Sequence, residues 1–186
     1  IGGTVSPAGG NFEEPVTQAT LKVVGAFHGL SRERSDARKY PAIHPIDSWS
    51  KYRGVVDMER VEQARSILKR SNEINQMMKV IGEEGTSAED YIVYQKGELL
   101  DAVYLQQNSF DPIDAACDPD RQIHEFNVLY DVLTRDFALS DKKEIRAFFN
   151  QVRQEFLDWH NTVFRTPEFE AQEKRLKDFY LSKAAG

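Results

Sequence analysis

Apolar side chains recur at three- and four-residue spacing along most of the chain beyond residue 54, a pattern that predicts amphipathic helices. Asp57 begins the first long helix, which Gly82 ends. The capping-box phrase at residues 86–90 begins a second helix that runs to about Gln106, with Gly97 weakening its middle. The spacing therefore predicts a helical hairpin immediately after residue 54.

Three further helices follow, and each has its own start signal: Asp118-Pro119, Ser140 and Thr166-Pro167. The predicted apolar stripes of the long helices are Val61, Ala64, Leu68, Ile74, Met77 and Ile81; Ile123, Phe126, Leu129, Leu133 and Phe137; Ile145, Phe148, Val152, Phe156, Trp159 and Val163; and Phe169, Leu176 and Phe179. Stripes of this kind, with charge on the opposite face, are typical of a compact helical bundle. The aromatic residues in them are interpreted as core rather than as a cofactor site.

The first 54 residues have a different pattern. Residues 1–5 are predicted to form a strand and residues 16–23 a short helix, while residues 24–30 favour a buried strand, with a continued helix as the alternative. Ser31 caps a charged helix to about Arg38. Two strands do not make a stable sheet, so this segment is expected to be the edge of an α/β domain of the nucleotide-binding type. The predicted fold is mainly α, with the C-terminal helical bundle (55–186) preceded by this partial edge (1–54).

Composition narrows the class of protein. The chain has 186 residues and a net charge of −6, which argues against a nucleic-acid-binding surface. Its single cysteine, Cys117, cannot form an internal disulfide and favours a reducing, cytoplasmic compartment. No apolar run approaches the roughly 20 residues of a membrane span, so no direct membrane insertion is expected. The chain opens on Ile1 and its first methionine is Met58, as expected of a fragment of a longer polypeptide.

The residues that could carry chemistry do not form a self-sufficient active site. The four histidines lie too far apart in sequence for a local metal-ligand spacing, and Cys117 has no nearby histidine to activate it. No phosphate-binding loop of the form GxxxxGK[ST] is present. We therefore expect no catalytic or metal-binding residue in the chain, and no activity from the fragment alone.

Two stretches remain as candidates for ligand binding. Pro41 and the downstream Pro45 restrict the backbone around Tyr40, which predicts a stiff, extended arm that presents the tyrosine ring to a flat ligand. The alternative is a ring that packs the loop onto its own domain. Gln107 and Phe110 follow the end of the second long helix, where an amide could bind a nitrogen-rich base and an aromatic ring could stack on it. The alternative there is an ordinary helix terminus.

Three phrases carry a family resemblance: residues 6–18 (SPAGGNFEEPVTQ), residues 40–43 (YPAI) and residues 104–111 (YLQQNSFD). In order and spacing they resemble the catalytic alpha chain, or A-type subunit, of V/A-type rotary ATPases, and the helical remainder is similar to the C-terminal bundle of that protein. The Tyr-Pro-Ala phrase is also similar to the catalytic β chain of F-type ATP synthases. Departures are Asn11, where the family usually has Asp, and Tyr40, where it commonly has Phe.

The resemblance implies that Tyr40 and Phe110 sandwich the adenine of ATP and that Gln107 lines the same pocket. It implies ATP or ADP with Mg²⁺ in the full-length alpha chain, whose phosphate loop, catalytic glutamate and magnesium ligands lie upstream. No tightly bound nucleotide is expected in the fragment.

The partners implied are the B-type subunit, which alternates with the alpha chain in a hexamer and supplies an arginine finger, and the central rotor stalk. The loop at residues 9–14, with Asn11 and Glu13, would face that stalk. ATP hydrolysis or synthesis would be coupled to proton or sodium transport by a complex peripheral to the membrane on its cytoplasmic side. The alternative function is a stand-alone helical protein-interaction domain that binds no nucleotide.

Overall fold

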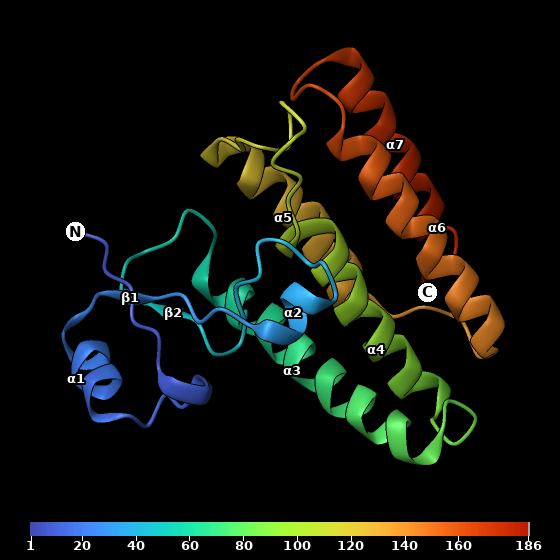
Figure 1. Ribbon diagram of the computed structural model, residues 1–186. Helices are drawn as coiled ribbons and strands as arrows, with labels where there is room; N and C mark the ends of the chain where they lie inside the picture. Colours follow the sequence, from blue (N-terminus) through green and yellow to red (C-terminus); the bar gives the residue numbers. More distant parts are fainter. Residues whose placement is uncertain (186) are drawn as a thin grey trace.

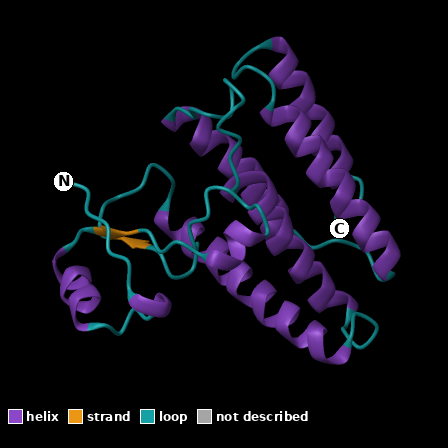
Figure 2. Ribbon diagram, viewed as in Figure 1, coloured by secondary structure: helices purple, strands orange, loops and turns teal. Residues whose placement is uncertain are grey.

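The computed structural model describes residues 1–185, which are mainly helical (Figures 1 and 2). The elements are a 3-10 turn η1 (Ala8–Gly10), α1 (Pro15–Val23), β1 (Ala26–Phe27), α2 (Arg32–Asp36), β2 (Trp49–Ser50), α3 (Met58–Ile81), α4 (Ala88–Leu100), the π-helix η2 (Asp101–Leu105), α5 (Pro119–Thr134), α6 (Lys142–His160) and α7 (Pro167–Leu181). The mainly α fold expected from the sequence is confirmed.

Side-chain caps begin the helices where the sequence predicts them. Asp57, Ser87, Asp118 and Thr166 each accept a hydrogen bond from a backbone N–H of the first turn, which satisfies a donor that the helix itself leaves free. The predicted cap at Ser140 is wrong by one residue, because the carboxylate of Asp141 accepts from two N–H groups, those of Lys143 and Glu144.

The helices pack as two antiparallel pairs, α3 with α4 and α6 with α7, with α5 between them (Figure 1). Helix α4 contacts α3, α5 and α6. A Cβ on Gly97 would lie 2.2 Å from the Cβ of Ser71, so the glycine allows α3 and α4 to approach closely. Gly97 thus marks a helix contact rather than a weak point of α4.

Most of the predicted stripe positions lie in one continuous core. Four are exposed instead: Met77, Ile81, Ile123 and Val163. On α3 the core-facing position after Ile74 is Met78 rather than Met77, because a helix of 3.6 residues per turn drifts around its axis. Val163 follows the end of α6 at His160, so the helical spacing no longer applies to it.

The N-terminal segment has less regular structure than predicted. Residues 1–5 are not a strand, and this prediction is wrong: they are irregular, and in the described chain no strand pairs with them. The predicted strand at 24–30 is reduced to β1, which pairs antiparallel with β2 through Ala26 with Ser50 and Phe27 with Trp49. The expected α/β edge is therefore a two-stranded ribbon. The boundary at residue 54 stays a prediction, and hydrogen bonds from Arg65 to the carbonyl oxygens of Ile46 and Ser48 cross it.

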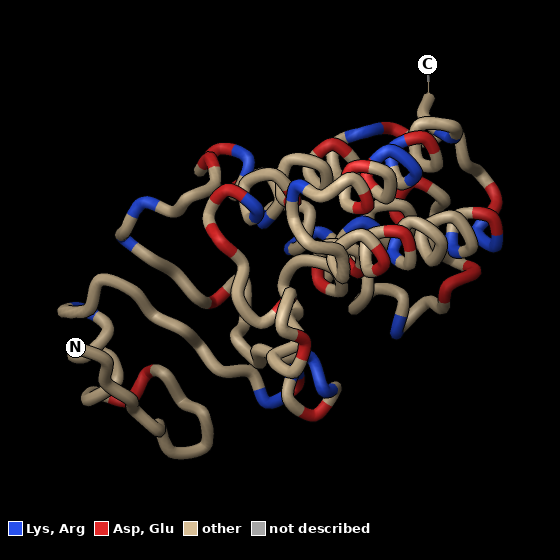
Figure 3. The backbone as a smooth tube through the Cα atoms, turned by 90° about the horizontal axis from the view of Figure 1, so that it is seen from above, with Lys and Arg blue, Asp and Glu red and all other residues tan. Residues whose placement is uncertain are grey.

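The charged residues sit mainly on the helices. Figure 3 shows acidic and basic residues interspersed over the helical part of the chain. Within residues 1–185, no helix combines the length and the apolar composition needed to cross a membrane.

Candidate functional site

The two candidate stretches meet in the structure. The backbone N–H of Gln107 donates to the carbonyl oxygen of Tyr40 at 2.9 Å, which ties the tyrosine arm to the segment after η2. The peptide bond between Tyr40 and Pro41 is cis. The residue Tyr40 is 53% exposed, so it lies at the surface rather than in the core.

Helix α4 ends in a π turn that the sequence does not reveal. The predicted helix to about Gln106 is confirmed in extent, but its last five residues, Asp101–Leu105, form η2. Gln106 leaves this turn with extended backbone, and its N–H donates to the carbonyl oxygen of Asp101 at 3.1 Å. Single π turns widen a helix locally and recur at functional sites. Here the π turn directs the chain from the bundle toward Tyr40.

The loop from Gln107 to Phe110 is held by its own hydrogen bonds. The side-chain Nε2 of Gln107 donates to the carbonyl oxygen of Asp114 at 2.6 Å, and the N–H of Asn108 donates to the Asp114 carboxylate at 2.5 Å. Gln107 therefore keeps its Oε1 oxygen as the acceptor that it can offer to a ligand. The residue Phe110 is 94% exposed, so almost none of its surface is used in packing.

A cavity of about 720 Å³ lies between the N-terminal segment and helices α3 and α5. Pro41 and Gln107 line it, together with Trp49, Tyr104 and Phe126. Tyr40 and Phe110 do not line it. The structure thus brings together the segments that carry the three predicted residues, and it places the two aromatic rings at the surface outside this cavity.

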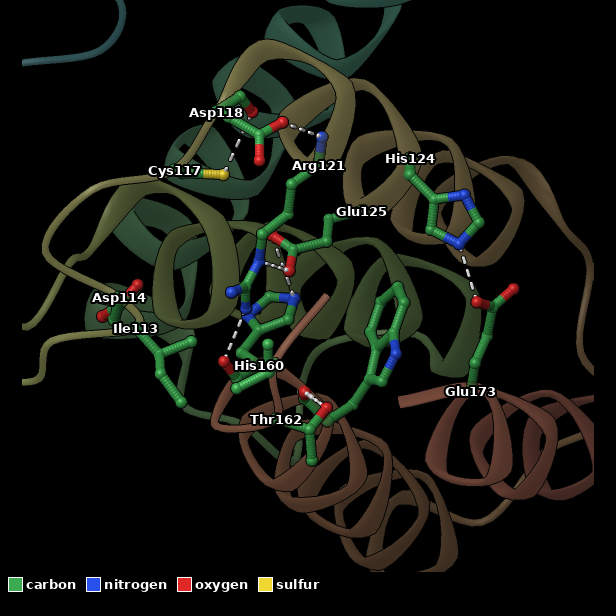
Figure 4. Close-up of polar contacts among 12 residues, drawn as sticks. Ile113, Asp114, Cys117, Asp118, Arg121, His124, Glu125, His160, Thr162 and Glu173 are labelled. Atoms are coloured by element: carbon green, nitrogen blue, oxygen red, sulfur yellow. Dashed lines mark hydrogen bonds and ion pairs between the residues drawn. The ribbon is translucent and has the colours of Figure 1, made fainter. Parts of the chain in front are cut away.

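A buried polar cluster, which the sequence did not single out, joins α5 to α6 (Figure 4). The Nε of Arg121 donates to Glu125 at 2.6 Å, and its Nη2 donates to the carbonyl oxygen of His160 at 2.6 Å. Burial raises the pKa of Glu125, and the Arg121 guanidinium opposes that rise. The sequence signal was the four-residue spacing of Arg121 and Glu125, which places them on one helix face.

Protonation of His160 is expected to destabilise the fold. Burial and, secondarily, the Arg121 charge lower the pKa of His160 from 6.5 to about 4. Between these values the unfolded chain binds a proton that the folded chain does not, so the free energy of unfolding falls as the pH is lowered through this range. The loss is roughly 3 kcal/mol at most.

Urea denaturation at a series of pH values checks this expectation. The control is His160→Gln, which cannot titrate but keeps a polar side chain, so its stability should fall less between pH 6.5 and pH 4 than that of the parent chain. Equal falls in the two proteins would contradict the assignment.

Three further features were considered for chemistry: metal-binding side chains, Cys117 and the loop at residues 9–14. Residues 1–185 contain no group of three or more His, Cys, Asp or Glu side chains arranged to hold a metal ion. Cys117 is an exposed residue, but its thiol is partly buried. That burial raises the pKa of the thiol and so disfavours the reactive thiolate. In the loop at residues 9–14, Asn11 accepts a hydrogen bond from the N–H of Glu13 at 2.9 Å, and both residues are exposed.

Comparison with known proteins places the chain in a family. Residues 58–149 match the family described as the C-terminal domain of V and A type ATP synthase. The V-type ATP synthase alpha chain of Borrelia turicatae is 62% identical over 183 residues, which are 98% of this chain and 32% of that protein. The corresponding protein of Treponema denticola is 59% identical over 184 residues, covering 99% of this chain and 31% of the relative.

A solved structure, that of the ATP synthase subunit NeqB from Nanoarcheaum equitans, shares the fold with a TM-score of 0.56 at 16% sequence identity. The match covers 67% of this chain and 32% of that one. The chain spans about a third of the length of the curated relatives it matches, and it aligns with them over nearly all of its own length. The chain belongs to the V-type ATP synthase alpha chain family and contains its C-terminal helical region.

Proposed function

We propose that this chain forms the adenine side of the nucleotide site in a V-type ATP synthase alpha chain, with Tyr40 and Phe110 stacking on the base and Gln107 lining the pocket. The observation that carries the proposal is the hydrogen bond from the Gln107 N–H to the Tyr40 carbonyl oxygen. This bond joins two of the sequence phrases that carry the family resemblance, residues 40–43 and 104–111. The high exposure of Phe110 supports it, because an aromatic ring without packing partners of its own is available to a ligand.

The complete alpha chain would hydrolyse or synthesise ATP in a rotary complex that couples the reaction to proton or sodium transport. ATP or ADP with Mg²⁺ would bind mainly through phosphate and metal ligands outside this chain, so the fragment alone would be inactive and would hold nucleotide weakly. The B-type subunit of the complex would complete the site, and the loop carrying Asn11 and Glu13 would face the central rotor stalk. The complex would be cytoplasmic and peripheral to the membrane.

The two rings would bind the base without touching the γ-phosphate or the attacking water. Stacking would therefore stabilise the bound substrate and the transition state about equally. Phe110→Ala or Tyr40→Ala in the assembled complex is expected to raise KM for ATP, leaving kcat nearly unchanged. The expected rise corresponds to roughly 1 to 3 kcal/mol if the rings stack as aromatic side chains do on nucleic-acid bases.

Steady-state ATPase kinetics measure these constants, with Tyr40→Phe as the control that keeps the stacking face. Inhibition by tripolyphosphate, which lacks a base, should be unchanged in the alanine variants. Unchanged KM for ATP in both alanine variants would refute the adenine assignment and would favour the alternative of a helical interaction domain without nucleotide. A collapse of kcat at saturating ATP would place the rings in the chemical step instead.

A further inference from the structure

A nearly buried carboxylate holds the tyrosine arm against the end of α4. Asp101, whose side chain is 7% exposed, receives a different cation on each oxygen. The Nη1 of Arg34 donates to Oδ1 at 2.6 Å, and the Nζ of Lys39 donates to Oδ2 at 2.5 Å. The three side chains therefore join α2 and the residue before Tyr40 to the first residue of the π-helix η2.

The backbone of Asp101 also takes part in this contact. Its carbonyl oxygen accepts from the N–H of Gln106 at 3.1 Å and from the Gln106 Nε2 at 3.3 Å. The next residue, Gln107, donates its N–H to Tyr40. Asp101 thus fixes both segments just before the point at which they meet, through its side chain on one segment and its backbone on the other.

The chemistry of the contact requires a carboxylate. The Nε and Nη2 atoms of Arg34 are buried without a hydrogen-bond partner among the described residues. Among those residues, the Arg34 guanidinium therefore depends on its Nη1 bond to Asp101. An asparagine at position 101 would offer one oxygen and would turn an NH₂ group toward the other cation. Two cations would then face a neutral side chain. The buried Arg34 guanidinium would lose its carboxylate partner, while Lys39 would keep only the more distant Glu98, whose Oε2 lies 3.9 Å from its Nζ.

We propose that Asp101 is a positioning residue that sets the Tyr40 ring relative to Gln107 and Phe110 before nucleotide binds. This inference rests on the proposed adenine site. Asp101 touches no part of the nucleotide and acts only through Arg34, Lys39 and the backbone of Gln106. Preorganisation of this kind reduces the ordering that binding must accomplish, so its loss weakens binding without altering the chemical step.

The test compares Asp101→Asn, Lys39→Met and the parent in the assembled complex with the complete alpha chain. Asp101→Asn is expected to raise KM for ATP roughly three- to tenfold, with kcat within about twofold, since one or two side chains lose their order. Lys39→Met, at a partly exposed position, should give a smaller rise in the same direction and remains informative if the asparagine variant fails to assemble.

Hydrogen exchange gives the second readout. The peptide spanning residues 101–110 should exchange faster in both variants, because the N–H groups of Gln106 and Gln107 report the contact. The control Asp90→Asn removes an exposed ion pair with Arg70 between α3 and α4 and should change neither readout.

The outcomes separate the two proposals. A raised KM in the Tyr40→Ala and Phe110→Ala variants with unchanged KM in Asp101→Asn and Lys39→Met would overturn the positioning role and leave the adenine site intact. Unchanged KM in the ring variants would overturn the adenine site itself. Unchanged exchange at residues 101–110 in both Asp101→Asn and Lys39→Met would show that the ion pairs do not hold the segment.

Discussion

Replacing Trp159 with alanine is expected to lower the free energy of unfolding of the chain by about 3 to 5 kcal/mol. Trp159 is completely buried in α6, and its ring centroid lies 4.9 Å from that of Phe169 in α7 and 5.9 Å from that of Phe156. Alanine would leave a cavity where α5, α6 and α7 meet, because packed helices close such a space only in part. Equilibrium urea denaturation followed by far-ultraviolet circular dichroism measures the loss.

Trp159→Phe is the matched control. It keeps an aromatic ring in the core and removes the indole Nε1, which is buried without a hydrogen-bond partner among the described residues. The phenylalanine variant is expected to lose much less stability than the alanine variant. A loss below about 1 kcal/mol in Trp159→Ala would mean that this tryptophan does not anchor the α6 and α7 pair.

Removal of the Arg121 charge is also expected to lower the free energy of unfolding strongly. Arg121→Met is expected to destabilise the chain by about 3 to 5 kcal/mol, because the buried Glu125 carboxylate would lose its cation. The two side chains are only 7% and 8% exposed and lie 2.6 Å apart. Arg121 also donates to the His160 carbonyl oxygen, so its loss would break the polar connection between α5 and α6 (Figure 4).

The double variant Arg121→Met with Glu125→Leu separates the charge effect from the packing effect. Replacing both partners by apolar side chains removes the uncompensated carboxylate, so this protein should recover much of the lost stability. The recovery is measured as a coupling energy in a double-mutant cycle. A double variant no more stable than Arg121→Met would contradict the interpretation and would assign the effect to the hydrogen bond with His160.

The helices could be predicted from the sequence because their signals are local. Asp57, Asp118 and Thr166 cap the helices they were expected to begin, Ser87 caps α4 from within the predicted phrase at residues 86–90, and the apolar spacing identified most of the core. The local failures are small, a helix cap misplaced by one residue and four stripe positions that are exposed, and the larger failures concern contacts between distant segments. Residues 1–5 have the composition of a strand, but a strand exists only where another strand pairs with it, and no local pattern reveals that partner.

The residues of the candidate site came from a family resemblance, and their role in binding adenine stays a prediction. The family resemblance identified Tyr40, Gln107 and Phe110 as candidates. The hydrogen bond between the Tyr40 and Gln107 segments and the π turn before Gln106 depend on tertiary packing, which no local pattern reveals. Asp101 carried no signal in the sequence, since a single aspartate in a helix is ordinarily solvated. Its role is visible only when Arg34 and Lys39, far away in sequence, are seen on its two oxygens.

The position of the adenine ring in the assembled complex tests the central claim most directly. A density map of the complex with a bound, non-hydrolysable ATP analogue, at a resolution that defines the base, locates it relative to this chain. The account predicts an adenine ring stacked against the side chains of Tyr40 and Phe110, with Gln107 beside its edge. An adenine ring in contact with neither aromatic side chain would contradict the account.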